Sequence, residues 1–193
     1  MGSHKHQWVT KERGRRVNGD KRQAAAFVTE GNPTEADGMY LRRAIANAQQ
    51  SRAAGRHPFS AIVVLDGAII AESQSMKTAD SDATNHSEMR VLRAASATRP
   101  PAVLARATLY ASTEPCAMCA GAAYWAGIGR VVYGCSEARL RALTGAHPWN
   151  PTLALPCREL FARGSRQIEV IGPYLEEEAA VPHLGFWDML KRP

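Results

Sequence analysis

Apolar residues along this chain form two kinds of run, one with the spacing of strands and one with the spacing of helices. Short runs rich in Val, Ile and Ala, each bounded by polar or turn residues, are typical of buried strands. They cover residues 59–65, 68–72, 107–112, 130–134 and 167–171. Asp66 and Gly67 separate the first two runs, and this dipeptide is typical of a two-residue hairpin turn.

Apolar positions three and four residues apart predict helices between these strands. We expect helices over 34–55, 88–97 and 115–126, and one or two more within 176–190. Thr34 can cap the first helix, and Pro100 stops the second. Because strands alternate with helices after an initial hairpin, the pattern predicts an α/β fold in which helices cover both faces of the sheet.

The first 33 residues lack this periodicity and are rich in charged residues, Gly and Asn. We therefore predict a mostly disordered basic tail over 1–33 and one folded domain over 34–193. Residues 1–22 carry seven basic and two acidic side chains, which leaves a net charge of only +1 for the rest of a chain of net +6. A solvated tail is the favoured interpretation, and an arm that binds nucleic acid is the alternative.

Composition supports one globular domain, since 45% of the 193 residues are hydrophobic. No apolar run approaches the roughly 18 residues of a membrane span, and no secretory leader opens the chain. With four Cys residues and no secretion signal, we expect no disulfides and a cytoplasmic location.

Two short segments carry the candidate chemistry, Asn85-His86-Ser87-Glu88 and Glu114-Pro115-Cys116-Ala117-Met118-Cys119. One His and two Cys in Cys-x-x-Cys spacing are ligands that Zn²⁺ takes, and three protein ligands leave a fourth position for water. Both segments come where the chain enters a helix, and a helix start favours the thiolate form of Cys. A structural zinc site would need a fourth ligand, for which Cys135 and Cys157 lack paired spacing.

Glu88 lies two residues beyond His86, where it can move protons at a water activated by the metal. Attack by that water on an amidine-like carbon of a purine or pyrimidine, followed by loss of ammonia, is hydrolytic deamination. The two segments therefore favour a zinc-dependent aminohydrolase.

The His-x-Glu and Pro-Cys-x-x-Cys pattern of these segments resembles the signature of the zinc-dependent cytidine deaminase superfamily. The resemblance extends over about residues 34–190. It implies a three-layer α/β/α fold with a central mixed five-stranded sheet, and a homodimer formed through the helices that flank the zinc site. It also implies that His86, Cys116 and Cys119 bind zinc and that Glu88 is the proton shuttle.

Two branches of the superfamily are represented. Residues 57–64 and 123–126 resemble the bacterial guanine deaminases, which act on free bases, whereas 119–122 and 127–132 resemble the tRNA adenosine deaminases. Both branches usually place Asn where this chain has Ser75, and Ala where it has Asn85 and Ser87. We predict that the substrate pocket contains Phe59, Ser75, Asn85 and Trp149, the last on a loop over 143–156 where ordinary packing is the alternative.

The predicted function is deamination of a free nucleobase or nucleoside, with a guanine-like purine as the favoured substrate. A tRNA adenosine deaminase is the alternative, although a nearly neutral domain does not favour phosphate binding. A non-catalytic zinc-binding module is the alternative from another class, and the presence of Glu88 argues against it.

Overall fold

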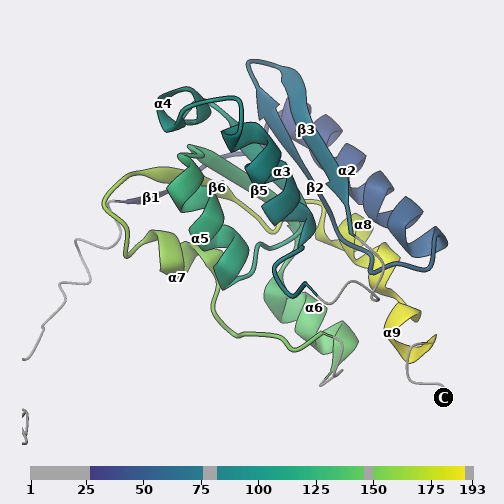
Figure 1. Ribbon diagram of the computed structural model, residues 1–193. Helices are drawn as coiled ribbons and strands as arrows, with labels where there is room; N and C mark the ends of the chain where they lie inside the picture. The colour runs from purple at the N-terminus through teal and green to yellow at the C-terminus, as the bar shows by residue number, and fades with distance from the viewer. Residues whose placement is uncertain (1–26, 76–81, 146–149, 190–193) are drawn as a thin grey trace, which may run out of the picture.

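A six-stranded mixed sheet forms the middle layer of the protein (Figure 1). The computed structural model describes residues 27–75, 82–145 and 150–189. The strands follow the order β1-β6-β5-β4-β2-β3, with bounds β1 (Val28–Glu30), β2 (Ser60–Leu65), β3 (Ala68–Gln74), β4 (Thr108–Thr113), β5 (Arg130–Cys135) and β6 (Ile168–Ile171). Strands β4, β5, β6 and β1 are parallel, and β2 is antiparallel to both of its neighbours.

Helices cover both faces of the sheet, as the alternating pattern predicted. On one face lie α3 (Ser87–Ser96), α4 (Pro101–Leu104), α5 (Ala117–Ala126) and α7 (Cys157–Phe161), and on the other α2 (Glu35–Ala53), α6 (Glu137–Thr144) and α8 (Glu176–Ala180). The chain then continues through a 3-10 turn, η1 (Val181–His183), into α9 (Phe186–Met189).

Alternate residues of each strand point to opposite faces, which divides the core into two clusters. On β2, Ala61 and Val63 pack toward α3 and α5, whereas Ile62 and Val64 pack toward α2. All four side chains are almost fully buried. This explains why the strand sequences are apolar throughout rather than alternating.

The hairpin of β2 and β3 turns at Asp66 and Gly67, as predicted. Both residues have positive φ, 49° and 81°, which suits the tight two-residue turn and which Gly67 adopts without steric cost. The strands pair from Leu65 opposite Ala68. The carboxyl end of β3 therefore lies beside the amino end of β2, at the same edge of the sheet as the carboxyl end of β4.

The sheet has six strands and not the predicted five. The additional strand, β1, lies within the segment that we assigned to the tail, and it pairs in parallel with β6, with Val28 opposite Ile168. Arg158 holds β1 from the side, because its guanidinium donates to a Glu30 carboxylate oxygen at 2.7 Å and to the Val170 carbonyl at 3.1 Å. The remaining tail residues, 1–26, lie outside the described residues.

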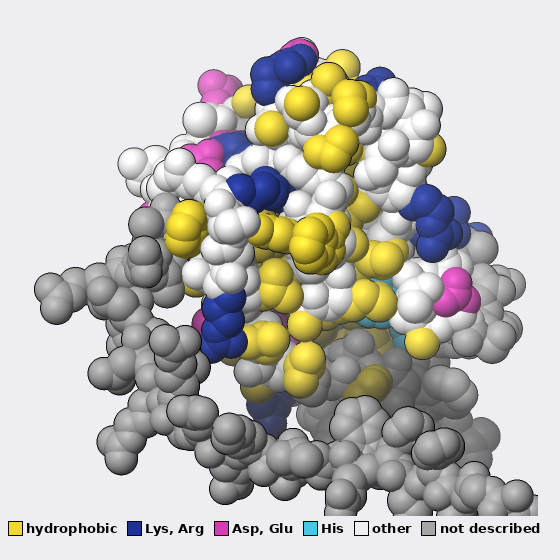
Figure 2. All heavy atoms as spheres, turned by 60° about the vertical axis from the view of Figure 1, so that its left-hand side comes forward, with side chains coloured by type: hydrophobic (Ala, Val, Ile, Leu, Met, Phe, Trp, Pro, Cys, Tyr) yellow, Lys and Arg dark blue, Asp and Glu magenta, His cyan; other side chains and the backbone are white. Residues whose placement is uncertain are grey.

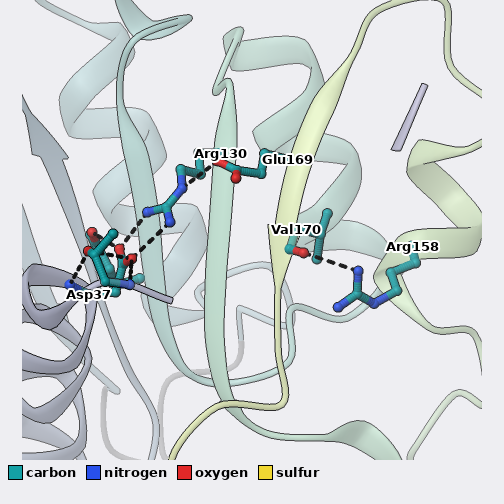
Figure 3. A network of polar contacts seen from close by, with 7 residues as sticks. Asp37, Arg130, Arg158, Glu169 and Val170 are labelled. Carbon is teal, nitrogen blue, oxygen red and sulfur yellow. Dashed lines mark hydrogen bonds and ion pairs between the residues drawn. The ribbon is translucent and has the colours of Figure 1, made fainter. Parts of the chain in front are cut away.

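Asp37 joins the start of α2 to the middle of the sheet (Figure 3). Thr34 and Asp37 form the capping box of α2, in which the Thr34 N–H donates to Asp37 Oδ2 at 2.7 Å. The Asp37 side chain is 1% exposed and accepts hydrogen bonds from Arg130 Nη2 at 2.8 Å and from the Tyr110 hydroxyl at 2.7 Å. Figure 3 shows Arg130 between Asp37 and Glu169, so one guanidinium connects α2, β5 and β6.

Among the described residues, no helix combines the length and the apolar character that crossing a lipid bilayer requires.

Candidate metal centre

Two helix starts bring the predicted metal ligands together at one edge of the sheet. His86 is the N-cap residue of α3, and Cys116 is the N-cap residue of α5, with Cys119 one turn further on. Helix α3 follows the connection that leaves the carboxyl end of β3, and α5 follows the carboxyl end of β4. Because these two strand ends share an edge of the sheet, the His and the Cys pair meet although 30 residues separate them.

The ligand atoms of His86, Cys116 and Cys119 all lie within 4.8 Å of one another. Nδ1 of His86 is 3.7 Å from Sγ of Cys116 and 3.5 Å from Sγ of Cys119. Tetrahedral zinc with Zn–S near ~2.3 Å and Zn–N near ~2.0 Å separates such atoms by about 3.5 Å. The donor set and its spacing therefore fit zinc, and His86 is exposed, which leaves one side of the cluster open to solvent.

The two thiols differ in acidity because one donates to the other. The Cys119 thiol donates to Cys116, and this hydrogen bond lowers the pKa of Cys116 to about 4. The same interaction, with burial of the thiol, raises the pKa of Cys119 well above its usual range. The lowered pKa of Cys116 favours its thiolate, and this anion is the form that a zinc ion requires.

Glu88 lies beside this cluster without belonging to it. Its Oε2 atom is 3.8 Å from Sγ of Cys119 and accepts a hydrogen bond from the Ser87 hydroxyl at 3.0 Å. The side chain is 6% exposed, and burial raises the pKa of its carboxyl. A carboxyl with a raised pKa can both accept and return a proton, which is what a proton shuttle has to do.

The structure brings two of the predicted pocket residues together. Ser75 N–H donates to the Phe59 carbonyl at 2.9 Å, so both lie at the edge of the sheet where the metal ligands lie. Asn85 immediately precedes His86, and its N–H donates to the Asp82 carbonyl at 3.1 Å. Trp149 lies outside the described residues.

Aromatic residues from the carboxyl-terminal segment pack around Phe59. The rings of His183 and Trp187 lie 5.2 and 6.0 Å from that of Phe59, and the two are stacked on each other. Nε2 of His183 is 3.2 Å from the hydroxyl of Thr113, three residues before Cys116. We did not predict the His183 contact, since nothing in a lone His 70 residues away points to it.

Cys135 and Cys157 are both fully buried and lie outside the metal cluster. The backbone N–H of Cys157 donates to a carboxylate oxygen of Glu114, at 2.9 Å. Glu114 lies inside the second motif, yet sequence reasoning gave it no role.

Comparison with known proteins decides the family. The model of the cytidine and deoxycytidylate deaminase zinc-binding region matches residues 34–135, which include all three candidate ligands and Glu88. The chain belongs to this family. It is therefore a zinc-dependent hydrolytic deaminase of the type that acts on nucleobases, nucleosides or tRNA adenosine.

Individual members of the deaminase family resemble the chain over different lengths. A Schizosaccharomyces pombe protein named "Probable cytosine deaminase" is 43% identical over 155 residues, 80% of this chain and 94% of its own length. Bacillus subtilis guanine deaminase is 43% identical over 95 residues, 49% of this chain and 61% of its own length. A solved structure from work on tRNA:A34 deaminases is 28% identical, covers 75% of this chain and 99% of its own, and has a TM-score of 0.58.

Proposed function

We propose that this deaminase acts on a free nucleobase or nucleoside, with His86, Cys116 and Cys119 holding the zinc ion and Glu88 moving the protons. The observation that carries this proposal is the position of Glu88, whose buried carboxylate lies 3.8 Å from Cys119 Sγ in a cluster open to solvent on the His86 side. A zinc-binding module without activity would not need a buried carboxylate at that place.

Each protein group has a defined part in the reaction. When bound, zinc supplies a nucleophile by lowering the pKa of water. Glu88 accepts one proton of the attacking water and delivers it to the ring nitrogen. It then transfers the second proton, from the hydroxyl of the adduct, to the amine, so that the C–N bond breaks and ammonia departs. The Ser87 hydroxyl, which donates to Glu88 Oε2, keeps that carboxylate oriented toward the cluster. Phe59 precedes β2 and Ser75 follows β3, at the edge of the sheet where the metal ligands lie, and these two residues are the candidates for contacts with the base.

Cytosine ranks before guanine as the proposed base. Local sequence segments favour guanine, and the match to the guanine deaminase from Bacillus subtilis covers 49% of this chain. The protein named as a cytosine deaminase resembles 80% of it at the same identity. The 155-residue match is longer than the zinc-binding region, which covers residues 34–135.

Ammonia release from cytosine, guanine, adenine and their nucleosides, measured alongside inosine formation in a tRNA anticodon substrate, tests this function. We expect turnover of cytosine or guanine and none of the tRNA. Activity on tRNA alone would contradict the proposal in favour of a tRNA adenosine deaminase.

We further propose that the protein is a homodimer that pairs through the face of α3, α4 and α5. Figure 2 shows hydrophobic side chains gathered across this side of the molecule. Trp125 of α5 is 81% exposed and borders a surface hollow of about 370 Å³ that Pro100, Pro101 and Ala126 also line. A large exposed apolar patch is typical of an interface between proteins.

Sedimentation equilibrium tests this pairing and should show a dimer. Trp125→Lys should shift the equilibrium toward the monomer. A monomeric wild type would refute the pairing.

A further inference from the structure

Glu114 is a buried carboxylate whose two oxygens bind two different segments. Only 7% of the Glu114 surface is exposed to solvent. Oε1 accepts a hydrogen bond from the Cys157 N–H at 2.9 Å, and Oε2 accepts one from the Glu137 N–H at 3.0 Å. Burying a carboxylate is costly unless donors compensate its charge. Here two backbone N–H groups do so.

Both donors are the first residues of helices. Glu137 begins α6, and Cys157 begins α7. The N–H groups of a first turn have no partner within their own helix and need an outside acceptor. A single side chain therefore supplies an acceptor to the helix before and the helix after the connection that includes residues 150–156.

The same residue is tied to the candidate metal centre through the chain itself. Glu114 precedes Cys116 by two residues, and its backbone N–H donates to the Cys135 carbonyl at the end of β5, at 2.7 Å. Figure 1 shows α7 and α6 on either side of the lower end of α5. The Glu137 side chain extends the contacts, because it accepts from the Leu153 N–H within the connection.

We propose that Glu114 is a positioning residue that holds residues 150–156 in place relative to Cys116 and thereby sets the affinity for substrate. This proposal rests on the proposed function. Without both hydrogen bonds, residues 150–156 have to be ordered when substrate binds, and that cost raises KM. Because Glu88 and the three candidate ligands keep their places, kcat changes little.

Glu114→Gln tests this role, since one amide oxygen can serve only one of the two N–H groups while the amide N–H₂ faces the other. Glu176→Gln is the matched control. Glu176 Oε1 also accepts a hydrogen bond at the start of α6, from Ser136 N–H at 3.0 Å, but its hydrogen bonds to Ser136 involve neither α7 nor residues 114–119. Zinc content, kcat, KM and hydrogen exchange of residues 150–156 are measured for both variants.

We expect Glu114→Gln to retain zinc, to raise KM about tenfold with kcat within about threefold, and to speed hydrogen exchange in residues 150–156. Glu176→Gln should keep KM near that of the wild type. Equal KM values in the two variants, or loss of zinc from Glu114→Gln, would overturn the proposal. If the wild type turned over no base, the proposed function would fail separately, and unchanged hydrogen exchange would still refute the role of Glu114.

A second pair of variants removes one hydrogen bond without touching Glu114. Proline is favoured at the first position of a helix, and Ser136 already has the extended backbone that precedes proline. Glu137→Pro therefore deletes the N–H donor, whereas Glu137→Ala deletes only the carboxylate. A several-fold higher KM in Glu137→Pro than in Glu137→Ala is expected, and equal values would contradict the proposal even if Glu114→Gln does not fold.

Discussion

A carboxylate oxygen of Glu88 lies 3.8 Å from the Sγ atom of Cys119. Glu88 is in the first turn of α3, and His86 is the N-cap residue of the same helix. A single helix start therefore supplies both a candidate ligand and the candidate proton shuttle. The two roles can be tested separately, because His86 is proposed to bind the metal and Glu88 is not.

Glu88→Gln should retain zinc and lose about 10³-fold in kcat, because the amide keeps the shape of the side chain but cannot accept and return a proton. Ammonia release and metal content on the same preparation measure the two effects. Residual turnover above a tenth of the wild-type rate would contradict the assigned role.

Removal of metal should affect folding as well as activity. Cys116→Ala deletes the thiolate of the cluster, so we expect loss of zinc, loss of activity and a lower melting temperature. Chelation of the wild-type protein should lower its melting temperature to that of the variant, and added zinc should restore only the wild type. Cys135→Ala is the control, since Cys135 is buried outside the cluster and should keep its metal.

Asp37→Asn should lower the free energy of unfolding by about 3 kcal/mol, because it leaves the half-buried Arg130 without its anionic partner in α2. Burial alone would raise the pKa of Asp37, but the Arg130 guanidinium and the donors of Thr34 and Tyr110 hold it well below its usual range. Urea unfolding measures the effect. Asp66→Asn makes the same chemical change in an exposed ion pair with Arg106 and should not destabilise the protein.

His183 should make the protein less stable in mild acid. Burial, with Arg52 and His57 nearby, lowers the pKa of His183 to about 4 from its ordinary 6.5. Between these values the unfolded chain takes up a proton that the folded chain does not. The contribution of His183 is therefore fully present above pH 6.5 and is lost as the pH falls toward 4, by about 2 kcal/mol at pH 5.

Urea unfolding at pH 7.5 and pH 5 checks this, with His183→Gln as the comparison. The variant should lose less stability than the wild type over that interval, since Gln does not titrate. Equal losses in the two proteins would show that His183 is protonated in the folded state.

The pattern of the sequence predicted those parts of the fold that neighbouring residues determine. The β2–β3 hairpin follows from Asp66 and Gly67, and the start of α2 follows from Thr34, whose hydroxyl accepts the Asp37 N–H. The three candidate ligands were predictable because zinc chemistry restricts both residue type and spacing. These ligands meet because the carboxyl ends of β3 and β4, after which they lie, share one edge of the sheet.

Features that depend on contacts between distant residues leave no local pattern in the sequence from which they could be predicted. Strand β1 has only three residues, and Arg158, which contacts its Glu30, is 128 positions away in the sequence. Helices α6 and α7 are short, and each begins at an N–H group that donates to Glu114. The aromatic packing on Phe59 likewise comes from residues near the end of the chain.

Strand β1 has a consequence for how the protein can be shortened. It occupies the outer edge of the sheet, where the Ile168 N–H donates to the Phe27 carbonyl at 2.9 Å. Removing the basic residues but stopping before Phe27 keeps that edge paired. Removing everything before residue 34 would leave β6 with a row of unpaired backbone groups, a template on which a second chain can add and aggregation can begin.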